Sequence, residues 1–90
     1  MNLQKYSWIQ VSVFYNRQNW NLLLNKGIKP FCVENIQTGI LMNYSINFNK
    51  IKGESINIIF QVINIQASEF LKIMQKYFRN FLNDFPSPDR

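Results

Sequence analysis

Residues 44–62 read YSINFNKIKGESINIIFQV, in which apolar and polar side chains alternate, pass through KIKGE, and alternate again. Alternation with a period of two is the pattern of a strand that buries one face. Gly53 in the KIKGE segment can adopt the positive φ that tight turns need. The stretch therefore predicts a β-hairpin with strands at Leu41–Asn49 and Ser55–Ile63, joined by a turn at residues 50–54.

The two predicted strands have one apolar face and one polar face. The side chains expected to face inward are Met42, Tyr44, Ile46, Phe48, Ile56, Ile58, Phe60 and Val62. The outward face is expected to carry Asn43, Ser45, Asn47, Asn49, Ser55, Asn57 and Gln61, interrupted by Ile59 and Ile63. Such a polar but uncharged face fits a binding site, the remnant of one, or a solvated sheet surface. Asparagine is abundant along the whole chain, as an AT-rich genome would also produce.

A further strand is expected near the start of the chain, where residues 5–15 read KYSWIQVSVFY. β-Branched and aromatic residues recur there at period two. One face carries Ile9, Val11, Val13 and Tyr15. The other face carries Trp8, Gln10, Ser12 and Phe14.

The pattern changes to a helical one after a polar break in which Asn16 or Asn19 is the expected N-cap. The apolar stripe of this helix comprises Trp20, Leu23, Leu24, Gly27, Ile28, Phe31 and Cys32. Pro30 falls inside the stripe, so a kink or break is expected near residues 26–29. Gly39 is the expected stop.

A second helix is predicted to begin at Ser68 as N-cap and to end before Pro86 and Pro88. Its apolar stripe comprises Phe70, Leu71, Met74, Tyr77, Phe78, Phe81, Leu82 and Phe85. Lys72, Lys76 and Arg79 lie on the opposite, solvated side. Residues 86–90 form a short polar tail.

The predicted order is therefore β-α-β-β-α, in a single domain over residues 1–90. Two helices on one face of a small antiparallel sheet make an α+β sandwich, here a ferredoxin-like arrangement that lacks its final strand. In that topology the first strand would pair with the third strand and with the missing fourth. Its edge is left open, which predicts a homodimer or a heteromeric partner, unless the tail or the N-terminus covers it.

The charge of the chain limits the kinds of partner that it is expected to bind. The net charge of +5 and the pI near 9.6 favour acidic partners. The basic residues are scattered rather than clustered, so a dedicated nucleic-acid tail is not expected. Cys32 is the single cysteine, which suits a reducing cytoplasmic location. Neither a signal peptide nor a membrane-spanning segment is expected.

Several chemistries are excluded by residue counts. The chain has no histidine, one cysteine and five scattered acidic residues, so no catalytic triad, metal site or carboxylate pair is expected. Its three glycines match no phosphate loop, and no cofactor is expected. Cys32 is expected to be a core residue.

The outward sheet face offers a different function, because Trp8 and Phe14 could stack nucleic-acid bases. The basic–aromatic strand motif of such proteins is missing, however, and no lysine or arginine follows Lys5 on this face. Packing against a partner or a neighbouring segment is therefore the favoured reading of these aromatic residues.

Five stretches together resemble a known family: WIQVSVFYN, NWNLLLNKGIKPF, YSINFN, GESINIIFQ and a helix that leads to NDFPSPDR. They are similar to the opening portion of the thiopeptide-type bacteriocin biosynthesis domain. That domain is the C-terminal elimination part of lantibiotic dehydratases and also occurs as separate proteins. Its members have a strand of the form F-F-I-R-Y-W and a hairpin partner of the form G-P-H-I-R-L-R.

The departures from these motifs concern charge. Asn47, Asn57 and Ile59 stand where the family has arginine, and Ser55 stands where it has histidine. Arginines there suit an acidic, glutamylated peptide, because guanidinium binds carboxylate in a bidentate fashion. Their replacement, and the absence of the rest of the domain, imply a relative that does not catalyse glutamate elimination alone.

The favoured hypothesis is a non-catalytic, truncated relative that binds a protein or peptide during the biosynthesis of a ribosomally made, modified peptide. A dehydratase-like protein or a precursor peptide would be its partner. The predicted binding face comprises Trp8, Gln10, Ser12, Phe14, Asn47, Asn57, Ile59 and Gln61. One alternative is an unrelated ferredoxin-like module that self-associates and binds a small ligand or single-stranded RNA. Another is an enzyme completed in trans by a second chain.

Overall fold

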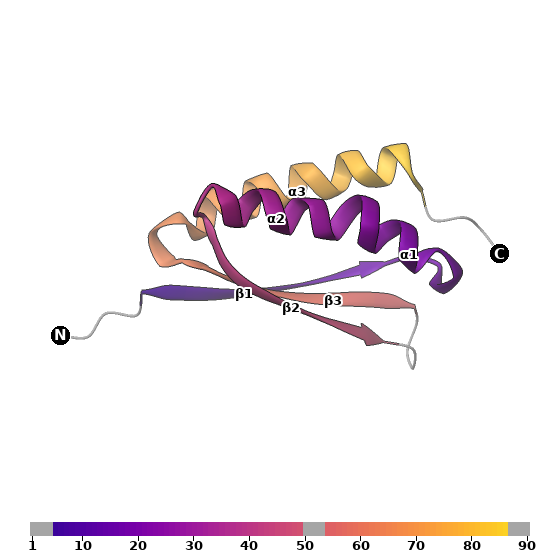
Figure 1. The fold of residues 1–90 in the computed structure, drawn as a ribbon, viewed down its shortest axis with the longest axis horizontal. Helices are drawn as coiled ribbons and strands as arrows, with labels where there is room; N and C mark the ends of the chain where they lie inside the picture. The colour runs from indigo at the N-terminus through magenta and orange to yellow at the C-terminus, as the bar shows by residue number, and fades with distance from the viewer. Residues whose placement is uncertain (1–4, 50–53, 87–90) are drawn as a thin grey trace.

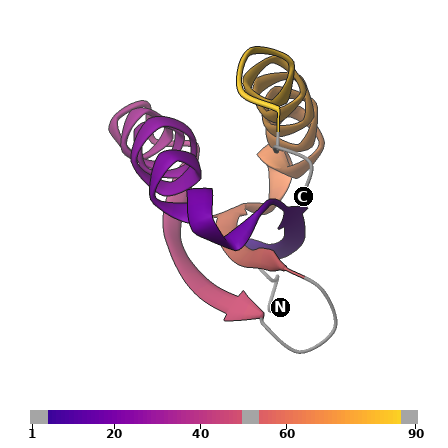
Figure 2. The same cartoon turned by 90° about the vertical axis from the view of Figure 1, so that its right-hand side faces the viewer.

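The computed structural model describes residues 5–49 and 54–86, arranged as one layer of helix on one face of a sheet (Figures 1 and 2). The sheet contains β1 (Tyr6–Phe14), β2 (Leu41–Asn49) and β3 (Ser55–Ile63). The predicted α+β class is confirmed, and the arrangement is compatible with a ferredoxin-like fold. The predicted turn at residues 50–54 lies, except for Glu54, outside the described residues.

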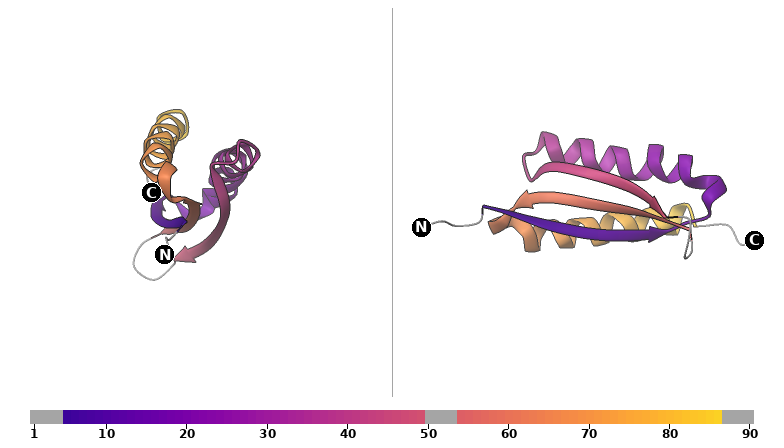
Figure 3. Two further views of the ribbon diagram at one scale, coloured as in Figure 1. Left: turned by 90° about the vertical axis from the view of Figure 1, so that its left-hand side faces the viewer. Right: turned by 90° about the horizontal axis from the view of Figure 1, so that it is seen from below.

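The three strands are antiparallel and lie in the order β1-β3-β2. Seen from the sheet side, β1 and β2 form the two edges and β3 lies between them (Figure 3). The central strand is also covered by the helices. Its predicted inward residues, Ile56, Ile58, Phe60 and Val62, are all fully buried.

The first helical stretch runs through residues 20–37 without a break. It comprises α1 (Trp20–Leu22), a π-helical segment η2 (Leu23–Ile28) and α2 (Lys29–Gln37), preceded by the 3₁₀ turn η1 (Arg17–Asn19) that Asn16 caps. The sequence predicted a kink or a break near residues 26–29; the helix does not break, and the irregularity there is the π-helical segment. The wider π turn, closed by Lys29 N–H and Leu24 O, lets the chain stay helical before Pro30, which has no N–H and crowds the preceding turn.

The helix termini show one confirmed prediction and one error. Gly39 adopts a φ of +87° directly after α2, as a glycine stop requires. The second long helix, α3 (Ala67–Asp84), follows the 3₁₀ turn η3 (Asn64–Gln66). Its N-cap is Gln66, so Ser68 is an exposed residue of the first helical turn and not the cap.

The core is an aromatic cluster between the sheet and the two long helical stretches. The ring of Phe31 in α2 lies 4.7 Å from that of Tyr77 and 5.4 Å from that of Phe78, measured between centroids. Phe60 from β3 and Phe70 from α3 approach each other to 5.0 Å. Within residues 5–49 and 54–86, no helix has the length and apolarity needed to cross a bilayer.

Two residues of the predicted apolar face of the hairpin are more exposed than expected. Met42 is 38% exposed, whereas its neighbour Leu41 is 1% exposed. The register of β2 against β3 shifts between Leu41 and Asn43, and this bulge reverses the direction of the side chains before it. Phe48 is half exposed and stacks on Trp20, with ring centroids 5.2 Å apart.

Candidate functional site

The outer edge of β1 is the first candidate site. Asn64 N–H donates to Lys5 O at 2.8 Å, and Tyr15 N–H donates to Glu54 O at 3.0 Å. In an antiparallel pair, hydrogen-bonded residues alternate with residues whose backbone groups point away from the partner. The odd-numbered residues of β1 therefore bond to β3. The residues with N–H and C=O groups directed to the outer edge are Tyr6, Trp8, Gln10, Ser12 and Phe14.

This edge, which we call the β1 edge, carries none of the usual devices that block strand addition. β1 has nine residues, none of them charged, and its register with β3 is regular throughout. At about 3.4 Å per residue, such a strand is roughly 30 Å long. Edge strands are usually protected by charges, prolines, bulges or short length.

The opposite edge, formed by β2, is different. The bulge between Leu41 and Asn43 interrupts it, and β2 curls strongly along its length (Figure 2). The alternation that applies to β1 directs Tyr44 N–H to the outer edge of β2. Asn43 Oδ1 accepts a hydrogen bond from that N–H at 2.8 Å. The β2 edge is therefore partly blocked, whereas the β1 edge is not.

The predicted binding residues do share the outer face of the sheet, the one turned away from the helices. The register places Trp8 opposite Gln61, Gln10 opposite Ile59, and Ser12 opposite Asn57. Asn57 also lies opposite Asn47 on the other side. Ser12 Oγ donates to Asn57 Oδ1 at 2.6 Å, so this part of the face is tied by its own hydrogen bond.

The aromatic residues of this face lie at its ends. Trp8 is 61% exposed and Phe14 is 67% exposed. They are six positions apart on β1, which separates them by about 20 Å. None of the three strands contains a lysine or arginine. The sheet face thus offers exposed rings but no cation for a phosphate, unlike the grooves that bind single-stranded nucleic acid.

Ser55, which the alternation assigns to the outer face, is instead buried with 1% of its surface exposed. It lies at the start of β3, between Phe14 and Asn49 of the flanking strands. Because β3 has a strand on each side, its neighbours cover the small side chain of Ser55, which an edge strand would leave exposed.

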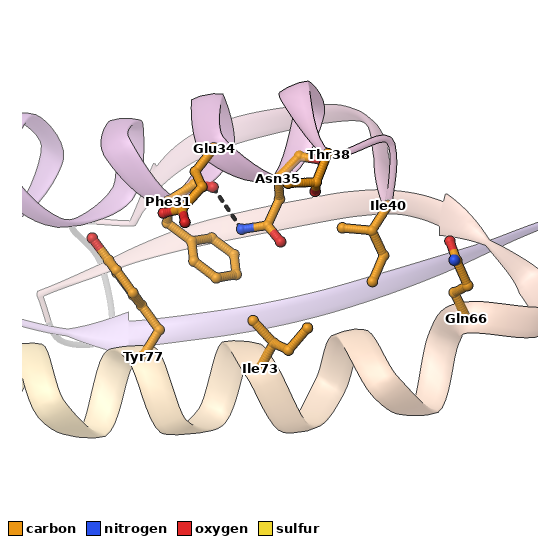
Figure 4. A pocket seen from close by; sticks show the side chains of 8 residues that line it. All are labelled: Phe31, Glu34, Asn35, Thr38, Ile40, Gln66, Ile73 and Tyr77. Atoms are coloured by element: carbon orange, nitrogen blue, oxygen red, sulfur yellow. Dashed lines mark hydrogen bonds between the residues drawn. The ribbon is translucent and has the colours of Figure 1, made fainter.

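Sequence reasoning missed the second candidate site, a pocket between α2 and α3 (Figure 4). The pocket has a volume of about 490 Å³. Its lining residues are Phe31, Glu34, Asn35, Thr38, Ile40, Gln66, Ile73 and Tyr77. The only signal in the sequence is a group of polar residues beside the apolar stripe of α2, and this pattern equally fits a solvated helix face.

The described residues offer little for catalysis. Burial raises the pKa of Cys32 to about 12, which keeps the thiol protonated and confirms this residue as part of the core. Across residues 5–49 and 54–86, no three metal-ligating side chains come together.

Comparison of the chain with family models, with curated proteins and with solved structures finds no match. The resemblance to the elimination domain of lantibiotic dehydratases therefore stays a prediction that rests on short motifs.

Proposed function

We propose that this protein is a non-catalytic binding module that takes up an extended segment of a partner along the β1 edge. The observation that supports this most directly is the regular and uncharged β1 edge, which no strand covers within residues 5–49 and 54–86, in contrast with the partly blocked edge of β2. Backbone hydrogen bonds supply affinity when a strand adds to a sheet, and side chains on alternate positions supply specificity.

The proposal includes a finer description of the fold. In a ferredoxin-like sandwich with the strand order seen here, the position beside β1 belongs to a fourth strand. The partner segment would occupy that position. It would pair with the outward backbone groups of β1 and pass near Trp8 or Phe14 at either end.

The nature of the partner follows from charge and from the motif resemblance. With a net charge of +5, the chain attracts an acidic segment. A precursor peptide of a modified-peptide pathway, or a dehydratase-like protein that acts on it, is the partner that the resemblance favours.

Co-purification with candidate precursor peptides and dehydratase-like proteins tests the proposal, together with titration calorimetry and light scattering. Gln10→Pro removes an outward N–H of β1 and should lower affinity at least tenfold. Ser45→Ala, on the outer face of β2 and away from the β1 edge, should bind normally. Unchanged binding by the proline variant would place the site elsewhere. A wild-type protein that stays monomeric and binds neither partner would contradict the proposal.

Single-stranded RNA should be included as a competing ligand. Binding that weakens with salt and is lost in Trp8→Ala would replace the protein-binding proposal with the nucleic-acid alternative.

A further inference from the structure

The pocket between α2 and α3 has walls of two kinds. Phe31, Ile40 and Ile73 supply apolar surface, and the remaining lining residues carry polar groups (Figure 4). Its volume of about 490 Å³ lies in the range of pockets that hold small molecules. It belongs to the helical layer and shares no residue with the β1 edge.

Three of the protons that side chains of this pocket can donate are already in use. Tyr77 Oη donates to Gly27 O at 2.7 Å. Thr38 Oγ donates to Asn35 O at 3.2 Å, and Asn35 Nδ2 donates to Phe31 O at 2.8 Å. Because a carbonyl oxygen only accepts, the direction of all three bonds is fixed.

What remains available to a ligand is a set of acceptors. Asn35 is only 7% exposed, and its Oδ1, which has no partner among the described residues, points into the pocket (Figure 4). The oxygens of Thr38 and Tyr77 keep lone pairs after donating their protons. Among the described residues, the N–H donors of the lining side chains that have no hydrogen-bond partner are those of Gln66 and the second N–H of Asn35.

Glu34 adds a negative charge to these acceptors. Among the described residues, no salt bridge occupies its carboxylate. Burial and then the Glu34 charge raise the pKa of Tyr77, which keeps the tyrosine protonated. The polar side of the pocket thus combines several acceptor oxygens with one negative charge.

We propose that this pocket binds a small ligand in which a protonated amine is joined to an apolar body. The ammonium group would donate to the oxygens of Asn35, Glu34 and Thr38, and the body would cover Phe31, Ile40 and Ile73. A charged donor forms a stronger hydrogen bond with these oxygens than a neutral donor does. An anionic ligand would be repelled by the Glu34 carboxylate.

The probes are 2-phenylethylammonium and 3-phenylpropionate, which are similar in size and opposite in charge. Each is titrated into the whole protein near neutral pH, and binding is followed by amide chemical shifts. The ammonium should bind saturably, with shifts centred on residues 34–38 and 73–77, and the carboxylate should not. Equal binding of both probes, or no saturable binding of the ammonium at millimolar concentrations, would overturn the proposal.

Two variants locate the site. Glu34→Gln should weaken ammonium binding about tenfold, because it removes a charge-assisted bond. Ile73→Lys should abolish binding by placing a cation in the apolar wall, whereas Glu69→Gln, which removes a carboxylate of α3 outside the pocket, should change nothing. Circular dichroism confirms folding of each variant. Unchanged affinity in both Glu34→Gln and Ile73→Lys would refute the site.

Discussion

The hydroxyl of Tyr77 in α3 donates a hydrogen bond to the carbonyl oxygen of Gly27 in the π-helical segment, at 2.7 Å. The two residues are 50 positions apart in the chain and join the two long helical stretches. A Cβ at Gly27 would lie 3.1 Å from Cε1 of Phe81, so the same glycine permits the close approach of α3. This contact closes one end of the helical layer above the sheet.

Removal of this hydroxyl should measurably destabilise the protein. Tyr77→Phe removes the hydroxyl that donates to the part-buried carbonyl of Gly27, so we expect the free energy of unfolding to fall by about 1 kcal/mol. Chemical denaturation measures the change. Tyr44→Phe is the matched control, because the Tyr44 hydroxyl makes no hydrogen bond within the described residues. Equal losses in the two variants would show that the Tyr77 bond contributes nothing specific.

Hydrogen exchange should alternate along β1 in the unbound monomer. The amides of Ile9, Val11 and Val13 face β3 and should exchange slowly, as in a stable sheet. The amides of Trp8, Gln10 and Ser12 face the free edge and should exchange almost without protection. Measurement by NMR at a concentration where light scattering gives a monomer tests this pattern.

The same experiment repeated on a complex or a dimer reports on the proposed partner strand. The fast amides at positions 8, 10 and 12 should become protected if a strand adds there. Uniform protection of β1 in the monomer would instead mean that another part of the chain already covers the edge.

The stability should decline in alkali because of the buried thiol. Burial raises the pKa of Cys32 from 9.0 to about 12, so the native state holds its proton while the unfolded chain releases it. This contribution is fully present below pH 9 and is lost as the pH rises from 9 to about 12. The raised pKa values of Tyr15 and Tyr77 act in the same direction above pH 10.

Cys32→Ala separates the thiol from the tyrosines. Between pH 9 and 10, its free energy of unfolding should fall less steeply with pH than that of the wild type, by the equivalent of up to one proton. Denaturant titrations in the presence of reductant give both slopes. Parallel slopes would mean that Cys32 ionises equally in the folded and unfolded states.

Local pattern alone predicted the strands well. The bounds of β2 and β3 match the expected ones, and the inward set of β3 is correct throughout. Alternation is a local property with a fixed period, so it survives in any fold that buries one face of the sheet. The glycine stop after α2 is equally local, because only the residue's own φ is involved.

Errors arose where neighbours in space set the outcome. Pro30 was accommodated by a π turn and not by a break, Met42 was turned outward by a bulge against β3, and the start of α3 was set by a 3₁₀ turn before Ser68. Each of these irregularities shifts the position of the backbone by about one residue, while the helix or strand still packs the same face against its neighbours. The spacing of apolar residues is the same with or without such a shift, so the sequence pattern does not predict it.

The sequence by itself determined which residues form strands and helices and which face of each is apolar, because those properties depend on spacing along the chain. Only the tertiary structure decided that, within the part of the chain that the structure describes, the β1 edge is open while Asn43 and a bulge partly block the β2 edge. Only the tertiary structure also brought Glu34 and Asn35 of α2 opposite Ile73 and Tyr77 of α3 to form a pocket. The β1 edge and the pocket both depend on which distant segments pack together and on which of their hydrogen-bonding groups are already bonded. The spacing of residues along the chain specifies neither of these.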